Sequence, residues 1–127
     1  MTTALPTTTP VQFEPEALKA TLMRLLKFEP VRMYVTHYGA IGGSVEAVRR
    51  LAGELLVQID DVCTLAASLR DAPDRHEQLK AGLMSRWLGA LQDRGWPGDP
   101  ALAAQWLAMD AELNAQGLEV WLDRPAR

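Results

Sequence analysis

The sequence has few residues of the kinds that form cross-links and metal sites. Its 127 residues include one cysteine, Cys63, and two histidines, His37 and His76. A single cysteine excludes a disulfide within the chain and fits a reducing compartment. We therefore expect a cytoplasmic protein.

Long apolar runs and clusters of basic residues are also missing. No stretch approaches the roughly 18–20 apolar residues of a membrane span, and the first five residues lack the basic start of a signal peptide. The formal net charge is −3, and the 13 Lys and Arg residues are scattered. Because a nucleic-acid or anionic membrane surface needs clustered basic side chains, we expect neither partner. The 48% apolar content is enough for a core in one domain.

Several motifs of enzyme chemistry are absent from the sequence. There is no GxGxxG or Walker pattern, no nucleophile elbow, no CxxC and no pair of catalytic carboxylates. Ser44 and Ser85 have no base at a recognisable spacing, so an independent serine hydrolase has little support.

One short stretch carries the clearest functional signal. Residues 31–36 alternate between two faces and are rich in β-branched side chains, which predicts a strand. His37 follows at its carboxyl end, where an imidazole can serve as a metal ligand or proton carrier. Gly39, Gly42 and Gly43 then predict a loop.

The residues around this strand form a longer pattern. Residues 6–15 read PTTTPVQFEP, a helical stretch and the strand follow, and then comes Thr36-His37-Tyr38-Gly39. This order resembles the C-terminal half of bacterial metallo-β-lactamase-fold hydrolases, over residues 6–69, and residues 109–118 resemble a tail found in one branch. The resemblance implies that His37 is the last ligand of a two-metal zinc site and that residues 1–12 cross the mouth of the active site.

The chain lacks the other metal-ligand motifs of this family. The family's H-x-H-x-D-H motif, its middle histidine and its bridging aspartate are absent, and His76 follows none of these patterns. A two-metal site needs several protein ligands to activate a water. The resemblance therefore implies part of a hydrolase of esters, thioesters or lactams, inactive alone. Zinc would bind only with ligands from another segment or chain, and the substrate is not identified.

The periodicity predicts a single, mainly α domain over residues 1–127, with about four helices and one short strand. By resemblance, it would be the C-terminal part of an α/β metallo-β-lactamase-type sandwich with appended helices. Residues 1–12 form an extended arm or a loose terminus, 13–43 a helix, strand and loop, 44–70 a long helix, and 74–123 the C-terminal helices.

The helix over residues 44–70 is the strongest structural signal. Ser44 is suited to cap it. Its apolar residues recur every three or four positions, at Val45, Val48, Ala52, Leu55, Ile59, Val62, Ala66 and Leu69. This seam predicts a central core helix or one that also forms an interface between subunits.

Two further helices are predicted after Pro73. Residues 74–77 read as a capping box, and we expect His76 in a solvated first turn without a metal. The first of these helices ends near Gly95, and its apolar residues are Leu79, Leu83, Met84, Trp87, Leu88 and Leu91. Asp99-Pro100 begins the second, which continues through Gly117 to about Asp123.

The last helix carries an apolar series and a polar group. Leu102, Trp106, Met109, Leu113 and Val120 keep a spacing of three and four if Gln116 fills the missing step. Asp110, Asn114 and Gln116 either line a pocket or are buried, hydrogen-bonded packing groups. The four tryptophans, Trp87, Trp96, Trp106 and Trp121, are expected to anchor the core and interfaces.

Two functions follow from these patterns. The first is a hydrolase segment that supplies His37 and helices around the substrate pocket. The second is a non-catalytic helical module for self-association or protein interaction. We expect His37 near the surface, and a homo-oligomer held by the 44–70 helix and the tryptophan-bearing helices, because a lone strand has unpaired edges and the apolar stripes are broad.

Overall fold

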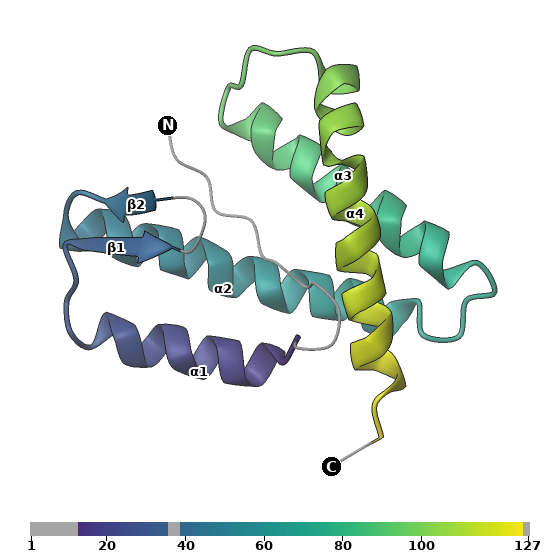
Figure 1. Ribbon diagram of the computed structural model, residues 1–127, viewed down its shortest axis with the longest axis horizontal. Helices are drawn as coiled ribbons and strands as arrows, with labels where there is room; N and C mark the ends of the chain where they lie inside the picture. Colours follow the sequence, from purple (N-terminus) through teal and green to yellow (C-terminus); the bar gives the residue numbers. More distant parts are fainter. Residues whose placement is uncertain (1–12, 36–38, 126–127) are drawn as a thin grey trace. The chain divides into compact units, whose positions relative to one another are not determined.

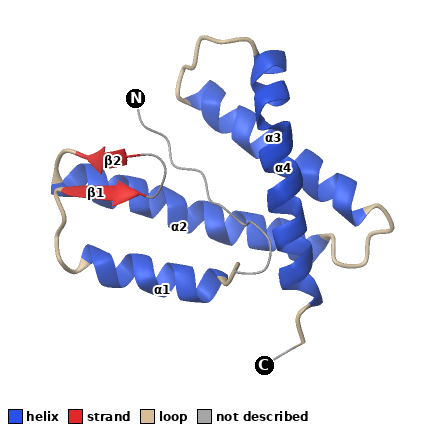
Figure 2. Cartoon of the chain, viewed as in Figure 1, coloured by secondary structure: helices blue, strands red, loops and turns tan. Residues whose placement is uncertain are grey.

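A computed structural model describes residues 13–35 and 39–125 (Figure 1). Its elements are α1 (Pro15–Leu26), β1 (Arg32–Val35), β2 (Gly39–Gly42), α2 (Val45–Ser68), α3 (Arg75–Asp93) and α4 (Pro100–Asp123). The expected mainly α class with four helices is confirmed, and Figure 2 shows how small the strand content is.

The described chain divides into two compact units. The first is Glu14–Asp60, and the second comprises Phe13 and residues 61–125, so α2 contributes to both. A single domain over residues 1–127 stays a prediction.

The first unit contains a β-hairpin in place of the single strand and glycine loop expected. β2 pairs with β1 antiparallel, with Arg32 opposite Gly42 and Val35 opposite Gly39. Glycine is a poor strand former, so the sequence pattern predicts a loop. Residues 39–42 nevertheless form a strand, because pairing with β1 provides hydrogen-bond partners for their backbone N–H and C=O groups. The premise of a lone strand with two open edges is therefore wrong, because β2 covers one edge.

Local signals place the helix starts in this unit. Pro15 lies in the first turn of α1, as its fixed φ favours. The Ser44 hydroxyl accepts a 3.0 Å hydrogen bond from the backbone N–H of Ala47, so the expected cap of α2 is confirmed. Gly43, with φ of 120°, makes the turn from β2 into α2.

α1 and the first part of α2 run side by side in opposite directions (Figure 1). Two ion pairs join their opposite ends. Lys19 Nζ lies 2.7 Å from Asp60 Oδ1, and Arg49 Nη2 lies 3.6 Å from Glu29 Oε1. Glu29 itself follows α1 with φ of 51°, in the left-handed region that a residue with a Cβ adopts at a cost.

The seam of α2 belongs to the core of the single chain. Its buried members are Val48, Ala52, Ile59, Val62 and Ala66, and Leu51 beside the seam is buried as well. The core alternative for this helix is therefore confirmed. Ile59, which we expected at a subunit interface, has 0% exposure within one chain and offers no surface to a second.

In the second unit, α3 packs against α4. α3 buries Leu79, Leu83 and Trp87. α4 buries mainly small residues between larger ones, namely Ala103, Ala111, Asn114, Ala115, Gly117, Leu118 and Leu122. Small side chains let two helix backbones approach closely. Phe13 also joins this core, in an edge-to-face contact with Trp121 at 6.1 Å between ring centroids.

The ends of α3 and α4 follow the sequence signals with one exception. Asp99 accepts a hydrogen bond from the backbone N–H of Ala101, and α4 continues to Asp123 as expected. Asp74 is the N-cap of α3, but its side chain caps no backbone N–H. The expected capping box is wrong because the Asp74 carboxylate accepts the side-chain amide of Gln78 instead.

No helix among residues 13–35 and 39–125 combines the length and the apolar content needed to cross a membrane.

Candidate functional site

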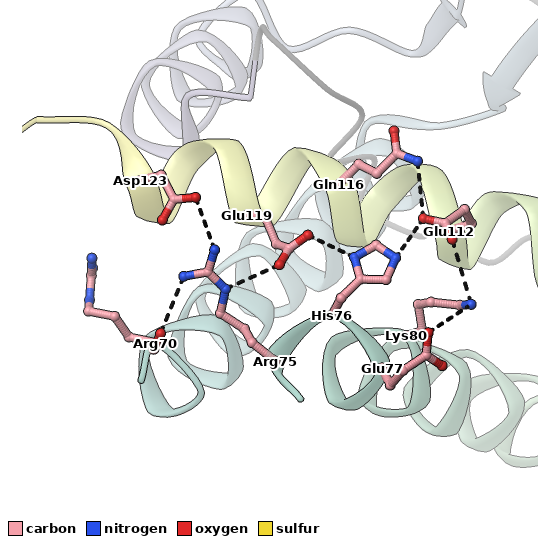
Figure 3. Close-up of polar contacts among 9 residues, drawn as sticks. All are labelled: Arg70, Arg75, His76, Glu77, Lys80, Glu112, Gln116, Glu119 and Asp123. Carbon is pink, nitrogen blue, oxygen red and sulfur yellow. Dashed lines mark hydrogen bonds and ion pairs between the residues drawn. The ribbon is translucent and has the colours of Figure 1, made fainter. Parts of the chain in front are cut away.

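His76 lies between two carboxylates of the neighbouring helix. It stands in the first turn of α3, and its Nδ1 lies 2.7 Å from Glu119 Oε2 while its Nε2 lies 2.7 Å from Glu112 Oε2 (Figure 3). Glu112 and Glu119 are seven residues apart, about two helical turns, so both project from one face of α4. Each ring nitrogen therefore has its own acceptor, which suits an imidazolium that donates from both sides.

The two carboxylates favour the charged form of the ring. The hydrogen bond with Glu119, followed by the one with Glu112, raises the pKa of His76 above its ordinary 6.5, although partial burial opposes the shift. The side chain is 31% exposed, so the expected solvated first turn is corrected to a half-buried one. The pKa of Glu112 is lowered, first by a hydrogen bond from Gln116 and then by the charge of His76.

Two further cations of α3 extend this arrangement along the α3–α4 contact (Figure 3). Arg75 lies 3.2 Å from Glu119 and 2.9 Å from Asp123. Lys80 lies 3.6 Å from Glu112. We call these six residues the charge ladder: Arg75, His76 and Lys80 from α3, and Glu112, Glu119 and Asp123 from α4. With His76 protonated, its three positive and three negative groups balance.

The ladder joins residues that are distant in the sequence. It could therefore not be predicted from the sequence alone. His76 and Glu119 are separated by 43 positions. The only local signal is the placing of Glu112, Glu119 and Asp123 on one face of a predicted helix. Nothing in the sequence states which helix supplies their cations.

A shallow depression of about 370 Å³ lies beside the ladder, at the turn between α2 and α3. Three cations line it, and each already has an acceptor in the chain. Arg70 donates to the carbonyl of Leu122, Arg75 donates to the carbonyl of Arg70 and to two carboxylates, and His76 faces Glu112 and Glu119. Since both nitrogens of His76 already face carboxylates of α4, the ladder holds α3 and α4 together.

The expected zinc ligand, His37, lies outside the described residues. The described strand β1 ends at Val35, two positions before it. Within residues 13–35 and 39–125, no group of three or more His, Cys, Asp and Glu side chains could hold a metal ion. These residues therefore do not by themselves complete the two-metal site that the resemblance implies.

The three polar residues singled out on α4 have different environments. Asn114 is 5% exposed, and its side-chain amide donates to the carbonyl of Asp110 at 2.7 Å, so it is a hydrogen-bonded packing group. Asp110 and Gln116 are exposed, and Gln116 donates to Glu112 at 3.1 Å. The expectation of burial is therefore correct for Asn114 and wrong for the other two.

The apolar series of α4 faces outward. We call Leu102, Trp106, Met109, Leu113 and Val120 the outer stripe; their exposed fractions are 40%, 66%, 68%, 36% and 38%. At 3.6 residues per turn, the stripe lies roughly opposite Ala111, Ala115 and Leu118, which are buried. Trp87 anchors the core as expected, whereas Trp106 projects from it.

No protein-family model matches this chain, and no curated protein or solved structure matches it. The family suggested by the motifs around His37 therefore stays a proposal.

Proposed function

We propose that this chain is the C-terminal helical segment of a metallo-β-lactamase-fold hydrolase, which supplies His37 as one metal ligand and helices around the substrate pocket. The order of elements around the motif supports the proposal. α1 begins at Pro15, the last residue of the F-E-P motif, and β1 ends at Val35, just before Thr36-His37-Tyr38-Gly39. These are the positions at which the resemblance calls for a helix and a short strand.

The segment is not catalytic alone. In the proposed enzyme, the zinc ligands other than His37 come from the missing N-terminal half of the fold or from a second chain. The zinc would supply an activated hydroxide for attack on an ester, thioester or lactam. A cytoplasmic setting belongs to the same proposal, because the chain has a single cysteine.

The reading frame upstream of Met1 tests this proposal directly. An in-frame H-x-H-x-D-H motif at that position would supply the missing ligands and support the assignment. A frame that encodes no such motif would exclude an N-terminal half on the same polypeptide and leave a second chain as the source of the remaining ligands.

Zinc binding by the chain itself separates two ways of completing the site. A dissociation constant tighter than about 1 μM, lost in His37→Ala and kept in His76→Gln, would mean that copies of this chain complete the site together. His76→Gln is the matched control because it removes the other histidine. No zinc binding would leave self-association as the function of the chain by itself.

A second function, self-association without catalysis, is favoured by the outer stripe. A helix that is apolar on two opposite faces is normally covered on both. α4 has α3 against one face and leaves Trp106 and Met109 more than half exposed on the other. This function needs neither His37 nor zinc.

A further inference from the structure

The outer stripe has the pattern of a helix-pairing seam. Together with Gln116, which occupies the gap between Leu113 and Val120, the stripe residues are separated by four, three, four, three and four positions. This alternation keeps side chains on one side of a helix and allows knobs-into-holes packing against a second helix. Over 18 residues the seam is about 27 Å long.

The size of the stripe matches the requirement of a small interface between two copies. At roughly 200 Å² for a large side chain, the exposed fractions of 36–68% amount to on the order of 500 Å² on one chain. The largest apolar patch on a typical monomer is of similar size and is often functional. Two such stripes facing each other would bury about 1,000 Å², the lower bound for a specific interface.

We infer that the outer stripe of α4 pairs with the same stripe of a second copy, with the two helices antiparallel about a two-fold axis. The axis crosses α4 at the level of Ala111, on the face opposite that buried side chain. The inference concerns the self-association function and does not depend on the hydrolase proposal. Two-fold pairs are the commonest protein dimers, and they bury the same surface on both partners.

Residues that face each other across this axis are complementary in size and polarity. It places Leu102 opposite Val120, Met109 opposite Leu113, and Trp106 opposite Gln116 of the second copy. The large indole thus faces the one polar position. The Gln116 amide already donates to Glu112, which leaves its carbonyl oxygen to accept the indole N–H of Trp106.

The charges at the edges of the stripe give the pairing a distinctive salt dependence. In this arrangement each edge of the stripe faces the same edge of the second copy. The two Asp110 carboxylates therefore approach each other along one edge. On the other edge Glu112 is balanced by His76 and Lys80. The remaining repulsion between Asp110 side chains weakens the pair and is screened by salt. A parallel pair would instead bring Glu119 near Arg124 of the second copy and would weaken with salt.

Sedimentation equilibrium of the full chain, from about 1 to 300 μM, tests the inference. We expect a monomer–dimer equilibrium that Trp106→Glu with Met109→Glu weakens at least tenfold. Val57→Glu is the matched control, because Val57 is 70% exposed on α2 and receives the same change. We also expect Asp110→Asn and added salt each to tighten the dimer.

Three results would overturn the inference. The first is a monomer throughout the concentration range. The second is a dimer that the double stripe variant does not weaken, or that Val57→Glu weakens equally. The third is a dimer weakened by salt and by Asp110→Asn, which excludes the antiparallel arrangement. Circular dichroism of each variant shows whether a lost dimer reflects a lost fold.

Discussion

At the scale of single residues, His76 is the most informative side chain. It has a carboxylate on each ring nitrogen, and its pKa is raised by Glu119 first and by Glu112 second. A group whose pKa is higher in the folded state stabilises that state while it is protonated. The contribution of His76 is therefore fully present below its unfolded pKa of about 6.5 and is lost as the pH rises through the folded pKa.

This predicts a fall in the free energy of unfolding as the pH rises from the unfolded pKa of about 6.5 through the higher folded pKa. Glu112, whose pKa is lowered, has the opposite sign: its contribution is present above its ordinary pKa and disappears in acid. Urea denaturation at several pH values measures both trends. We expect His76→Gln to flatten the decline above pH 6.5, because the amide does not titrate.

His37→Gln is the matched control for this experiment, since it removes the other histidine. The control should keep the decline. If His76→Gln retains the full decline, or if His37→Gln abolishes it, the charge ladder is not its source.

Glu29 has a backbone conformation that its side chain opposes. Its φ of 51° costs a residue with a Cβ about 1 kcal/mol or more, whereas glycine adopts this region freely. We expect Glu29→Gly to raise the free energy of unfolding by about 0.5–1 kcal/mol, although the ion pair with Arg49 is lost. That pair is 3.6 Å long between exposed side chains and contributes little.

Thermal and urea denaturation of Glu29→Gly and Glu29→Ala separate the two effects. The alanine variant loses the same ion pair but keeps a Cβ at this φ. It should be no more stable than the original chain. Equal stabilities of the two variants would show that the backbone at Glu29 is not strained.

At the scale of helices, glycines inside α2 and α3 are not equivalent. A Cβ added at Gly53 or Gly89 would meet no atom within 4 Å. A Cβ added at Gly82 would lie 2.7 Å from Cδ2 of Leu65. Gly53 and Gly89 therefore weaken their helices without a packing benefit, whereas Gly82 allows a close approach between two segments of the second unit.

We expect Gly53→Ala and Gly89→Ala each to increase the free energy of unfolding by about 0.5–1 kcal/mol, the helix-propensity difference. Gly82→Ala is the control at a crowded position, and its gain should be smaller or negative because Leu65 must move. Chemical denaturation measures all three. A gain at Gly82 equal to that at Gly89 would show that the Leu65 contact is unimportant.

At the scale of the whole molecule, the chain alone is expected to have no hydrolase activity. The H-x-H-x-D-H motif is absent from its sequence, and both nitrogens of His76 face carboxylates. Assays with lactam, thioester and phosphodiester substrates, with and without zinc, measure this directly. Zinc-dependent turnover that disappears in His37→Ala would show that the chain assembles its own site.

The sequence by itself determined the helices and most of their ends. Pro15, Ser44 and the Asp99-Pro100 pair act on backbone groups within one turn, so their effect requires no distant partner. The buried seam of α2 was also predictable, because its apolar residues recur every three or four positions along the helix.

Tertiary structure decided which face of α4 is covered and which residues pair across helices. Both faces of α4 are apolar, and α3 packs on the one with small residues because they allow close contact, which leaves Trp106 outside. The glycines of β2 became a strand only because β1 supplied hydrogen bonds. His76 pairs with Glu112 and Glu119, which lie 36 and 43 positions away in the sequence. Such a pair depends on how two helices pack and not on local backbone preference.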